Sequence, residues 1–279
     1  MKKNKNHMIF YIFLSILFIC IIEGLLCQPQ IDYVIRRQIA IISWESNDNL
    51  PFNFCSENNF FFSFWEEKGF VESLQSIFLF SAIIILIKFL KNLKKKIRLI
   101  NLFIQLHIIG LIYFFGEEIS WGQHYFNWLT PDFFKIYNNQ NETNIHNISN
   151  IFDQLPRTLT LIWCGLSVPI ILILNNFLKI NKNIYFLICP NKKLIFLSIT
   201  LLFFVLPDLI IDKFNLHPER SNIIEPFFNS AYFYDIISFN FIRLSEMHEL
   251  IFSFYFFYYS YLILKNLNQK SIYQSNSAG

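Results

Sequence analysis

Residues 99–124 read LINLFIQLHIIGLIYFFGEEISWGQH. The apolar run that ends at Phe115 is close to the length of about 20 residues that a membrane-spanning helix needs. Two adjacent carboxylates, Glu117 and Glu118, follow it directly. Acidic side chains at the edge of a membrane helix are costly to place, so we expect these two to have a specific role. The stretch therefore predicts a helical membrane protein with a polar site at one end of its helices.

The composition of the whole chain agrees with this prediction. Of its 279 residues, 54% are hydrophobic and only 15% are charged, and the mean hydropathy is +0.38. In soluble domains about a quarter of the residues are charged. We therefore expect one integral membrane domain over residues 1–279. The sequence has no phosphate-binding loop, dinucleotide fingerprint or nucleic-acid-binding motif, so we expect the lipid bilayer and not a nucleic acid as partner.

Six apolar stretches predict an all-α polytopic bundle of about six transmembrane helices. They cover residues 8–26, 70–90, 97–115, 158–178, 194–211 and 246–264. A cleaved signal peptide is the alternative for the first stretch, but its length favours an anchor helix. Three longer segments, 28–68, 119–157 and 212–245, would form loops on one side of the membrane. Within the second loop, Pro131 and Asp132 predict a short helix from Phe133 to Tyr137.

The basic residues predict the orientation of the bundle. The N-terminal segment, the two short connectors with their span ends, and the C-terminal tail hold 15 of the 23 Lys and Arg residues and none of the 20 acidic residues. The positive-inside rule then places these segments, and with them both termini, in the cytoplasm. The three longer loops would face the periplasm or the exterior of a bacterial inner membrane.

Acidic and histidine side chains cluster at the predicted outer ends of the spans. Carboxylates that crowd together at low dielectric share protons, pair with cations or bind a metal ion. Glu and His ligands together would suit zinc, manganese or iron, whereas an oxygen-rich set would suit calcium. We take Glu72, Glu117 and Glu118 as candidate catalytic residues, and His146, Glu249, Glu246 and Asp208 as candidate metal ligands.

A structural role is the alternative for each of these acids. Glu72 and Glu246 fall in the first turns of their helices, where the helix dipole favours a negative charge. Glu117 and Glu118 lie at the opposite, disfavoured end. His107 lies eleven residues before Glu118 and therefore on the same face of the helix, where a proton or ion path is one hypothesis and a hydrogen-bonded core histidine the other.

Three functions remain open at this point. The first is a metal-dependent hydrolase or transferase that acts on a lipid or lipid-linked substrate through a metal-bound water. The second is an ion-coupled transporter that uses His107, Gln105 and Glu118. The third is a non-catalytic scaffold or assembly factor whose outer loops, residues 119–157 above all, bind a partner protein.

Four short pieces of the sequence carry a resemblance. They are WEEKGFVE at 65–72, GEEISWGQ at 116–123, ETNIHN at 142–147 and EMHE at 246–249. Together they resemble a family of bacterial multi-pass membrane proteins without a known activity, which implies a membrane location. A weaker likeness, through Trp65 to Glu72, is to the alkaline ceramidase superfamily, which implies zinc bound by histidines. Here Glu246 to Glu249 stand where that superfamily has a His-x-x-x-His pair.

Overall fold

The computed structural model describes residues 11–19, 21, 69–93, 97–138, 142–145, 148–178, 188–214 and 244–276. Within these ranges the chain forms helices and turns and no strand, which confirms the all-α prediction for the described part. The chain divides into two units. One contains residues 1–71 and 203–248, and the other contains residues 72–202 and 249–279. The second unit holds most of the described helices.

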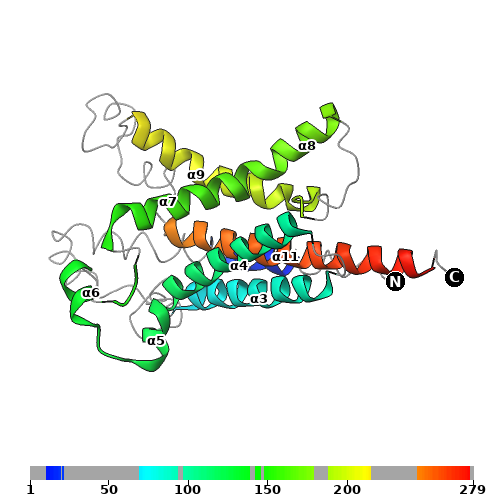
Figure 1. Cartoon of the computed structure of the whole chain (residues 1–279). Helices are drawn as coiled ribbons and strands as arrows, with labels where there is room; N and C mark the ends of the chain where they lie inside the picture. The colour runs from blue at the N-terminus through cyan, green and yellow to red at the C-terminus, as the bar shows by residue number, and fades with distance from the viewer. Residues whose placement is uncertain are drawn as a thin grey trace, which may run out of the picture. The chain divides into compact units, whose positions relative to one another are not determined.

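Two consecutive helices, α3 (Phe70–Asn92) and α4 (Arg98–Glu118), coincide with the predicted second and third spans. Each of the two helices carries apolar side chains all around its axis, which is typical of helices that lie in lipid. Phe80 of α3 and Phe115 of α4 pack with their ring centroids 5.6 Å apart. Figure 1 shows the two helices side by side. Because α4 continues three residues past the predicted end at 115, Glu117 and Glu118 belong to its last turn.

The predicted fourth span is a composite of three helical segments. It begins as α7 (Asn150–Leu161), passes through a π-helical turn, η5 (Ile162–Leu166), and ends as α8 (Ser167–Leu178). Helix α7 starts eight residues before the predicted boundary at 158, because the proline at position 156 is accommodated inside the helix. A π-turn inserts one residue into the helical repeat, which is frequent at bends and at functional positions.

Helix α9 (Ile195–Phe214) follows a short turn, η7 (Lys192–Leu194). The side chain of Asn191 accepts a hydrogen bond from the backbone N–H of Lys193 and so caps this turn. The hydroxyl of Ser198 donates to the backbone oxygen of Cys164 over 2.6 Å, which joins α9 to the π-turn. A side chain at Gly165 would lie 3.1 Å from Leu202, so the glycine allows the two helices to approach closely.

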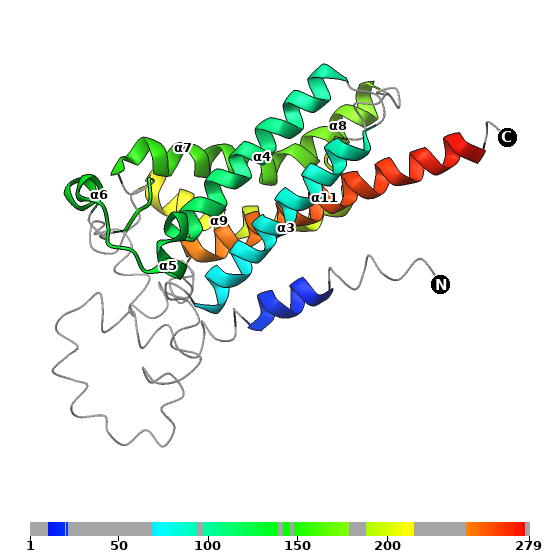
Figure 2. The same ribbon diagram turned by 60° about the horizontal axis from the view of Figure 1, so that its bottom comes forward.

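Helix α11 (Leu244–Asn276) is the long C-terminal helix, and its residues from 249 onward belong to the second unit. Tyr255 and Tyr259 are fully buried. The hydroxyl of Tyr255 lies 3.2 Å from that of Ser167 on α8, and Phe254 packs edge-on against Phe78 of α3. Figure 2 shows α3 running alongside α11. Hydrogen bonds between helices are a principal source of association in lipid, where burial of apolar surface gives no advantage.

Three helical stretches are long and apolar enough to cross a membrane, namely Phe70–Asn92, Arg98–Glu118 and Leu155–Leu174. They correspond to the predicted second, third and fourth spans, and they identify the chain as a membrane protein. The predicted fifth and sixth spans fall within α9 and α11. Of the first span, residues 11–19 and 21 are described and helical, while most of the predicted loops 28–68 and 212–245 lies outside the described residues.

In the first unit, residues 11–19 form a helix with one buried and one exposed face. Phe13 and Leu17, four residues apart, are buried, whereas Tyr11 and Phe18 are exposed. This spacing is that of a helix with a single packed face.

Candidate functional site

The polar site is built around the turn that ends α4. Three consecutive residues there have a positive φ: Ser120 at 45°, Trp121 at 54° and Gly122 at 102°. A left-handed conformation costs roughly 1–2 kcal/mol for each residue other than glycine. Two such residues in succession persist only where neighbouring contacts hold them. Those contacts come from the segment around residues 142–145, a second polar stretch that follows GEEISWGQ along the chain.

Glu117 connects the two segments directly. Its side chain is buried, with 8% of its surface exposed. The indole N–H of Trp121 donates to Oε1 over 2.6 Å, and the backbone N–H of Ile145 donates to Oε2 over 2.7 Å. Hydrogen bonds to an ionised carboxylate are roughly twice as strong as those between neutral groups. Glu117 therefore fixes both the strained turn and a loop 28 residues further along the chain.

Glu142 forms a second link between the same segments. Its Oε2 accepts hydrogen bonds from the hydroxyl of Ser120 over 2.8 Å and from the side-chain amide of Asn144 over 2.7 Å. The amide of Asn138, itself buried, donates to the backbone oxygen of Glu142 and to the side-chain oxygen of Asn144. These bonds give most polar groups of the buried turn a partner, as burial requires.

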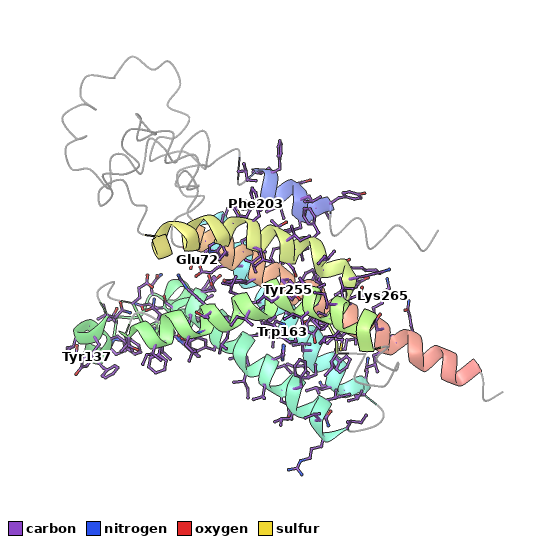
Figure 3. All side chains as sticks on the ribbon, turned by 90° about the horizontal axis from the view of Figure 1, so that it is seen from above. Glu72, Tyr137, Trp163, Phe203, Tyr255 and Lys265 are labelled. Carbon is purple, nitrogen blue, oxygen red and sulfur yellow. The ribbon has the colours of Figure 1, made fainter. Side chains whose placement is uncertain are left out.

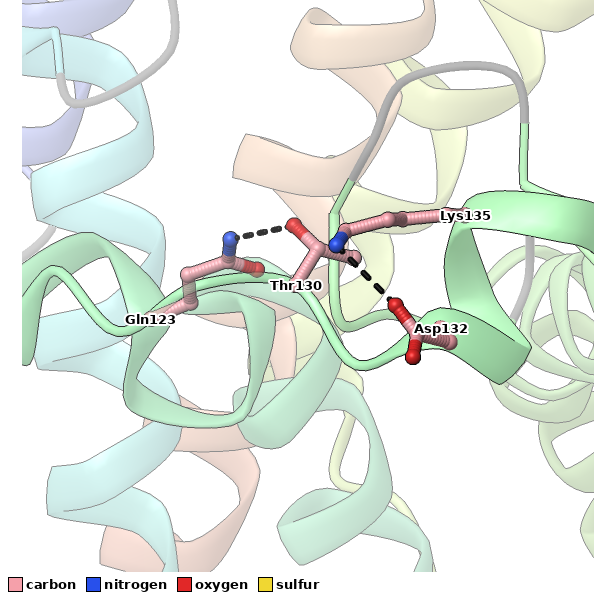
Figure 4. A network of polar contacts seen from close by, with 4 residues as sticks. All are labelled: Gln123, Thr130, Asp132 and Lys135. Atoms are coloured by element: carbon pink, nitrogen blue, oxygen red, sulfur yellow. Dashed lines mark hydrogen bonds and ion pairs between the residues drawn. The ribbon is translucent and has the colours of Figure 1, made fainter.

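The side-chain amide of Gln123 forms a third link. Its nitrogen donates to the hydroxyl of Thr130 over 2.9 Å, which Figure 4 shows, and its oxygen accepts from the backbone N–H of Thr143 over 2.6 Å. The indole N–H of Trp128 reaches the hydroxyl of Thr143 over 3.3 Å. Residues 116–138 and 142–145 thus form one hydrogen-bonded unit, which we call the cap.

Two glycines allow the rings of the cap to pack. A Cβ atom at Gly116 would lie 2.9 Å from two ring carbons of Trp121, so the indole lies flat against the glycine. A Cβ atom at Gly122 would lie 2.9 Å from the ring of Trp128, and its φ of 102° also favours glycine. The two glycines of the sequence GEEISWGQ are therefore steric requirements of the cap.

The surface of the cap is largely apolar. It contains α5 (Gln123–Phe126) and α6 (Asp132–Tyr137), the second of which confirms the short helix predicted there. Its most exposed large side chains are Phe126 and Leu129, with 77% and 89% of their surface accessible. The other exposed large apolar side chains of the cap are Trp121, Tyr125, Trp128, Phe133, Ile136 and Tyr137.

Glu249, one of the predicted metal ligands, forms an ion pair with Arg157. The guanidinium nitrogen lies 2.7 Å from Oε1 of the carboxylate, and 40% and 22% of the Arg and Glu side chains are exposed. Arg157 is the third residue of the candidate span Leu155–Leu174. The pair joins α7 to α11 at the edge of the apolar region and supplies one of the few cations available to the acids.

The other predicted site residues are distributed over several helix ends. Glu118 is half-buried in the last turn of α4, and Glu72 and Glu246 lie in the first turns of α3 and α11. Asp208 falls within α9, but its side chain is not among those described, and His146 lies outside the described residues. Of the seven predicted residues, the structure connects Glu117 to the loop segment at 145 and Glu249 to Arg157.

Metal binding gains no support from the described residues. Among them, no group of three or more His, Cys, Asp or Glu side chains lies close enough together to hold a metal ion. The oxygens of Glu117 are directed at N–H donors, and one oxygen of Glu249 at Arg157. A metal site that includes His146 or Asp208 remains a prediction.

His107 lies among aromatic rings inside the second unit. Its ring centroid is 5.2 Å from that of Trp163 and 6.0 Å from that of Tyr259. Nδ1 lies 3.0 Å from the backbone oxygen of Phe103, so this nitrogen carries the hydrogen. Gln105, which the carrier hypothesis groups with His107, is exposed. These contacts favour a core histidine over a member of an ion path.

Sequence reasoning missed several contributors to the cap. Asn138, Thr130 and the backbone N–H of Ile145 were not among the predicted residues. The N–H of Ile145 donates to Glu117, which was predicted, whereas Asn138 and Thr130 bond to the side chains of Asn144 and Gln123. The sequence did contain a signal for these contacts. The two polar stretches lie close together along the chain, the first contains two glycines, and turn-forming residues lie between them. Comparison of the chain with protein-family models, with curated proteins and with solved structures finds no match.

Proposed function

We propose that this chain is a non-catalytic scaffold of a bacterial inner membrane, whose cap docks a partner protein on the outer side. The observation that carries the proposal is the use of the cap's acids. Both carboxylate oxygens of Glu117 and one of Glu142 accept hydrogen bonds that fold the cap. Acids that would serve hydrolysis need an oxygen directed at substrate, water or metal. The bonded oxygens of Glu117 and Glu142 are directed at the cap itself.

The cap has two properties of a docking surface. First, its backbone is fixed by side-chain bonds at both ends, and a fixed loop loses little conformational entropy when it binds. Second, its exposed side chains include Trp121, Tyr125, Trp128 and Tyr137, and aromatic residues are enriched at the centres of protein interfaces. The occupant we propose is an apolar, aromatic-binding segment of another membrane protein.

The orientation of the bundle is part of the proposal. Six spans with both termini in the cytoplasm place the cap on the outer side, because the cap follows the third span. The distribution of lysines supports this arrangement. The helical state of α9 and α11 over the predicted fifth and sixth spans supports it as well.

Site-specific photo-crosslinking tests the docking proposal. A photoreactive phenylalanine analogue replaces Phe126, Leu129 or Ile136 of the cap, one at a time, in membranes of the native cell. The control position is Ile109, an exposed apolar residue in the middle of α4. We expect all three cap positions, but not Ile109, to yield an adduct with the same protein, identified by mass spectrometry.

The same experiment includes a variant that disrupts the cap. In a Gly116→Ala background, where Trp121 is displaced, we expect the common adduct to decrease at all three positions. Adducts with lipid alone, or with other parts of this chain, would contradict the proposal. A stoichiometric divalent ion in the purified protein that is lost in Glu118→Gln would favour the metal-dependent hydrolase instead.

A further inference from the structure

At the end of the second unit opposite the cap, we propose a binding site for the phosphate of an anionic phospholipid, formed by Lys192, Lys193 and Lys265. Figure 3 shows Lys265 and Tyr137 of the cap at opposite ends of the helices. The site is independent of the proposed scaffold function, because none of its residues takes part in the cap.

Two elements distant in sequence contribute these lysines. Lys192 and Lys193 form η7, the turn that precedes α9, and Lys265 lies on α11. The hydroxyl of Tyr259 on α11 donates to the backbone oxygen of Ile188 over 2.5 Å, which attaches the connector before η7 to α11. Lys265 follows Tyr259 by six residues, about 9 Å along the helix axis.

Buried apolar side chains accompany the lysines on both elements. Leu194, directly after the two lysines, and Leu262, one turn before Lys265, are both buried. The ammonium group of Lys265 also lies 5.8 Å from the centre of the Tyr261 ring, which orients it by a cation–π contact. The lysines are therefore brought together by the packing of the connector on α11.

The electrostatic potential of this cluster favours an anionic ligand. Burial, followed by repulsion from Lys265 and Lys192, lowers the pKa of Lys193. The segments 88–98, 179–193 and 265–279, which meet this side of the membrane in the predicted topology, contain no Asp or Glu. A phosphate group placed among the three ammonium groups would relieve this repulsion, and the N-terminus of α9 beside it favours the same charge.

The neighbouring apolar surface points to a lipid and not to a soluble phosphate. Phe196 and Ile199 are exposed and follow Lys192 by four and seven residues, so they lie on the same face of the helix. The acyl chains of a phospholipid bound at the lysines would run along these side chains. Basic clusters between membrane helices at the cytoplasmic side are suited to anionic headgroups.

Lipid titration of the full chain in detergent micelles tests the site. Phosphatidylglycerol and phosphatidylcholine are added to the purified protein, and the bound lipid is counted by native mass spectrometry. We expect a preference for phosphatidylglycerol in the wild type. In Lys193→Gln/Lys265→Gln we expect the affinity for phosphatidylglycerol to fall roughly 25-fold, because each lysine near a membrane surface contributes about fivefold.

The matched control is Lys91→Gln, which removes one charge at the end of α3 and is expected to keep the preference. The charge-preserving variant Lys193→Arg/Lys265→Arg should also keep it, and it serves where the glutamine variant fails to fold. An unchanged preference in the glutamine variant, or its loss in the arginine variant, would overturn the proposal. Displacement of the lipid by millimolar inorganic phosphate would instead indicate a site for free phosphate.

Discussion

The hydroxyl of Tyr113 on α4 donates a hydrogen bond to the backbone oxygen of Phe152 on α7, over 3.1 Å. In a regular helix this oxygen would accept from the N–H group four residues later. That residue is Pro156, which has no N–H group. The proline therefore leaves an acceptor within α7, and a tyrosine from a neighbouring helix supplies the donor. The contact explains how α7 continues through a proline that usually interrupts a helix.

The contribution of Tyr113 should depend on the proline. We expect Tyr113→Phe to lower the free energy of unfolding by about 1 kcal/mol, because it leaves the oxygen of Phe152 without this donor. In a Pro156→Ala background, where a backbone N–H is restored, the same change should have a smaller effect. Unfolding in detergent micelles, followed by circular dichroism, measures both differences. Equal losses in the two backgrounds would refute this explanation.

Gly116→Ala should destabilise the cap. The added methyl group would lie 2.9 Å from the ring of Trp121, and overpacking of this kind costs about 1–3 kcal/mol. The indole N–H would also move away from Glu117. Gly110→Ala is a control in the same helix, because a Cβ atom there has no neighbour within 4 Å. We expect tryptophan fluorescence and the melting temperature to change only in the first variant.

Glu117→Gln should show that the carboxylate acts as a double acceptor. A glutamine retains one oxygen, so its NH₂ group would face the N–H of either Trp121 or Ile145. Leaving a buried donor without an acceptor costs about 1–3 kcal/mol. The measurement is limited proteolysis of residues 119–145 in membranes, which should become faster in the variant. Proteolysis at the wild-type rate would contradict this role.

A control for that experiment is available within the same cap. Lys135 and Asp132 form an ion pair three residues apart on α6, 3.1 Å long and largely exposed (Figure 4). Pairs of this kind contribute little to stability, because water screens them. Lys135→Gln also removes a charge from the cap, yet we expect proteolysis at the wild-type rate.

The ion pair between Arg157 and Glu249 should show measurable coupling. We expect a double-mutant cycle with Arg157→Gln and Glu249→Gln to give about 1–2 kcal/mol, between the values typical of exposed and of buried pairs. The loss of stability in the double variant should be smaller than the sum of the losses in the two single variants. Additive losses, measured by thermal unfolding in micelles, would show that the pair does not act as a unit.

Cys189 reports on the orientation of the bundle. It lies on the connector between α8 and η7, which is cytoplasmic in the proposed orientation. In a variant whose other four cysteines are serine, we expect labelling of intact cells by a membrane-permeant maleimide but not by an impermeant one. Labelling by both reagents would contradict the predicted topology and indicate that Cys189 lies outside the cytoplasm.

The pH dependence of that labelling follows from the surroundings of the thiol. Partial burial raises the pKa of Cys189. The thiolate is the reactive form, so at neutral pH the side chain should react more slowly than a cysteine in an unfolded peptide. The rate should continue to rise at pH values where the reaction of the peptide has already levelled off. A rate that levels off together with that of the peptide would contradict the burial.

The sequence was sufficient to predict the three candidate membrane spans among the described residues, because apolar length is a local property of the chain. The ends of the second and third spans agree with prediction to within a few residues. The fourth span differs most, since its start depends on a contact between Tyr113 and Phe152 that no local pattern contains. The π-turn at 162–166 likewise depends on packing against α9.

For the site, the sequence indicated the two polar stretches but not the way they combine. The helix dipole disfavours a negative charge at the C-terminal end of α4. This led to the hypothesis that Glu117 has a functional role. That argument considers only the helix that carries the acid. It omits the loop, which returns after 28 residues and supplies the N–H of Ile145. A bond between residues so far apart follows from the three-dimensional course of the chain.

The same bond also sets an order of assembly in the cell. Glu117 is synthesised together with α4, but its second donor, the backbone N–H of Ile145, lies on a segment that is synthesised later. Until residues 142–145 are available, the strained turn at Ser120 and Trp121 lacks the bonds from this segment that help to hold it. The apolar surface of the cap thus takes its final form only after residues 142–145 have joined the turn that ends α4.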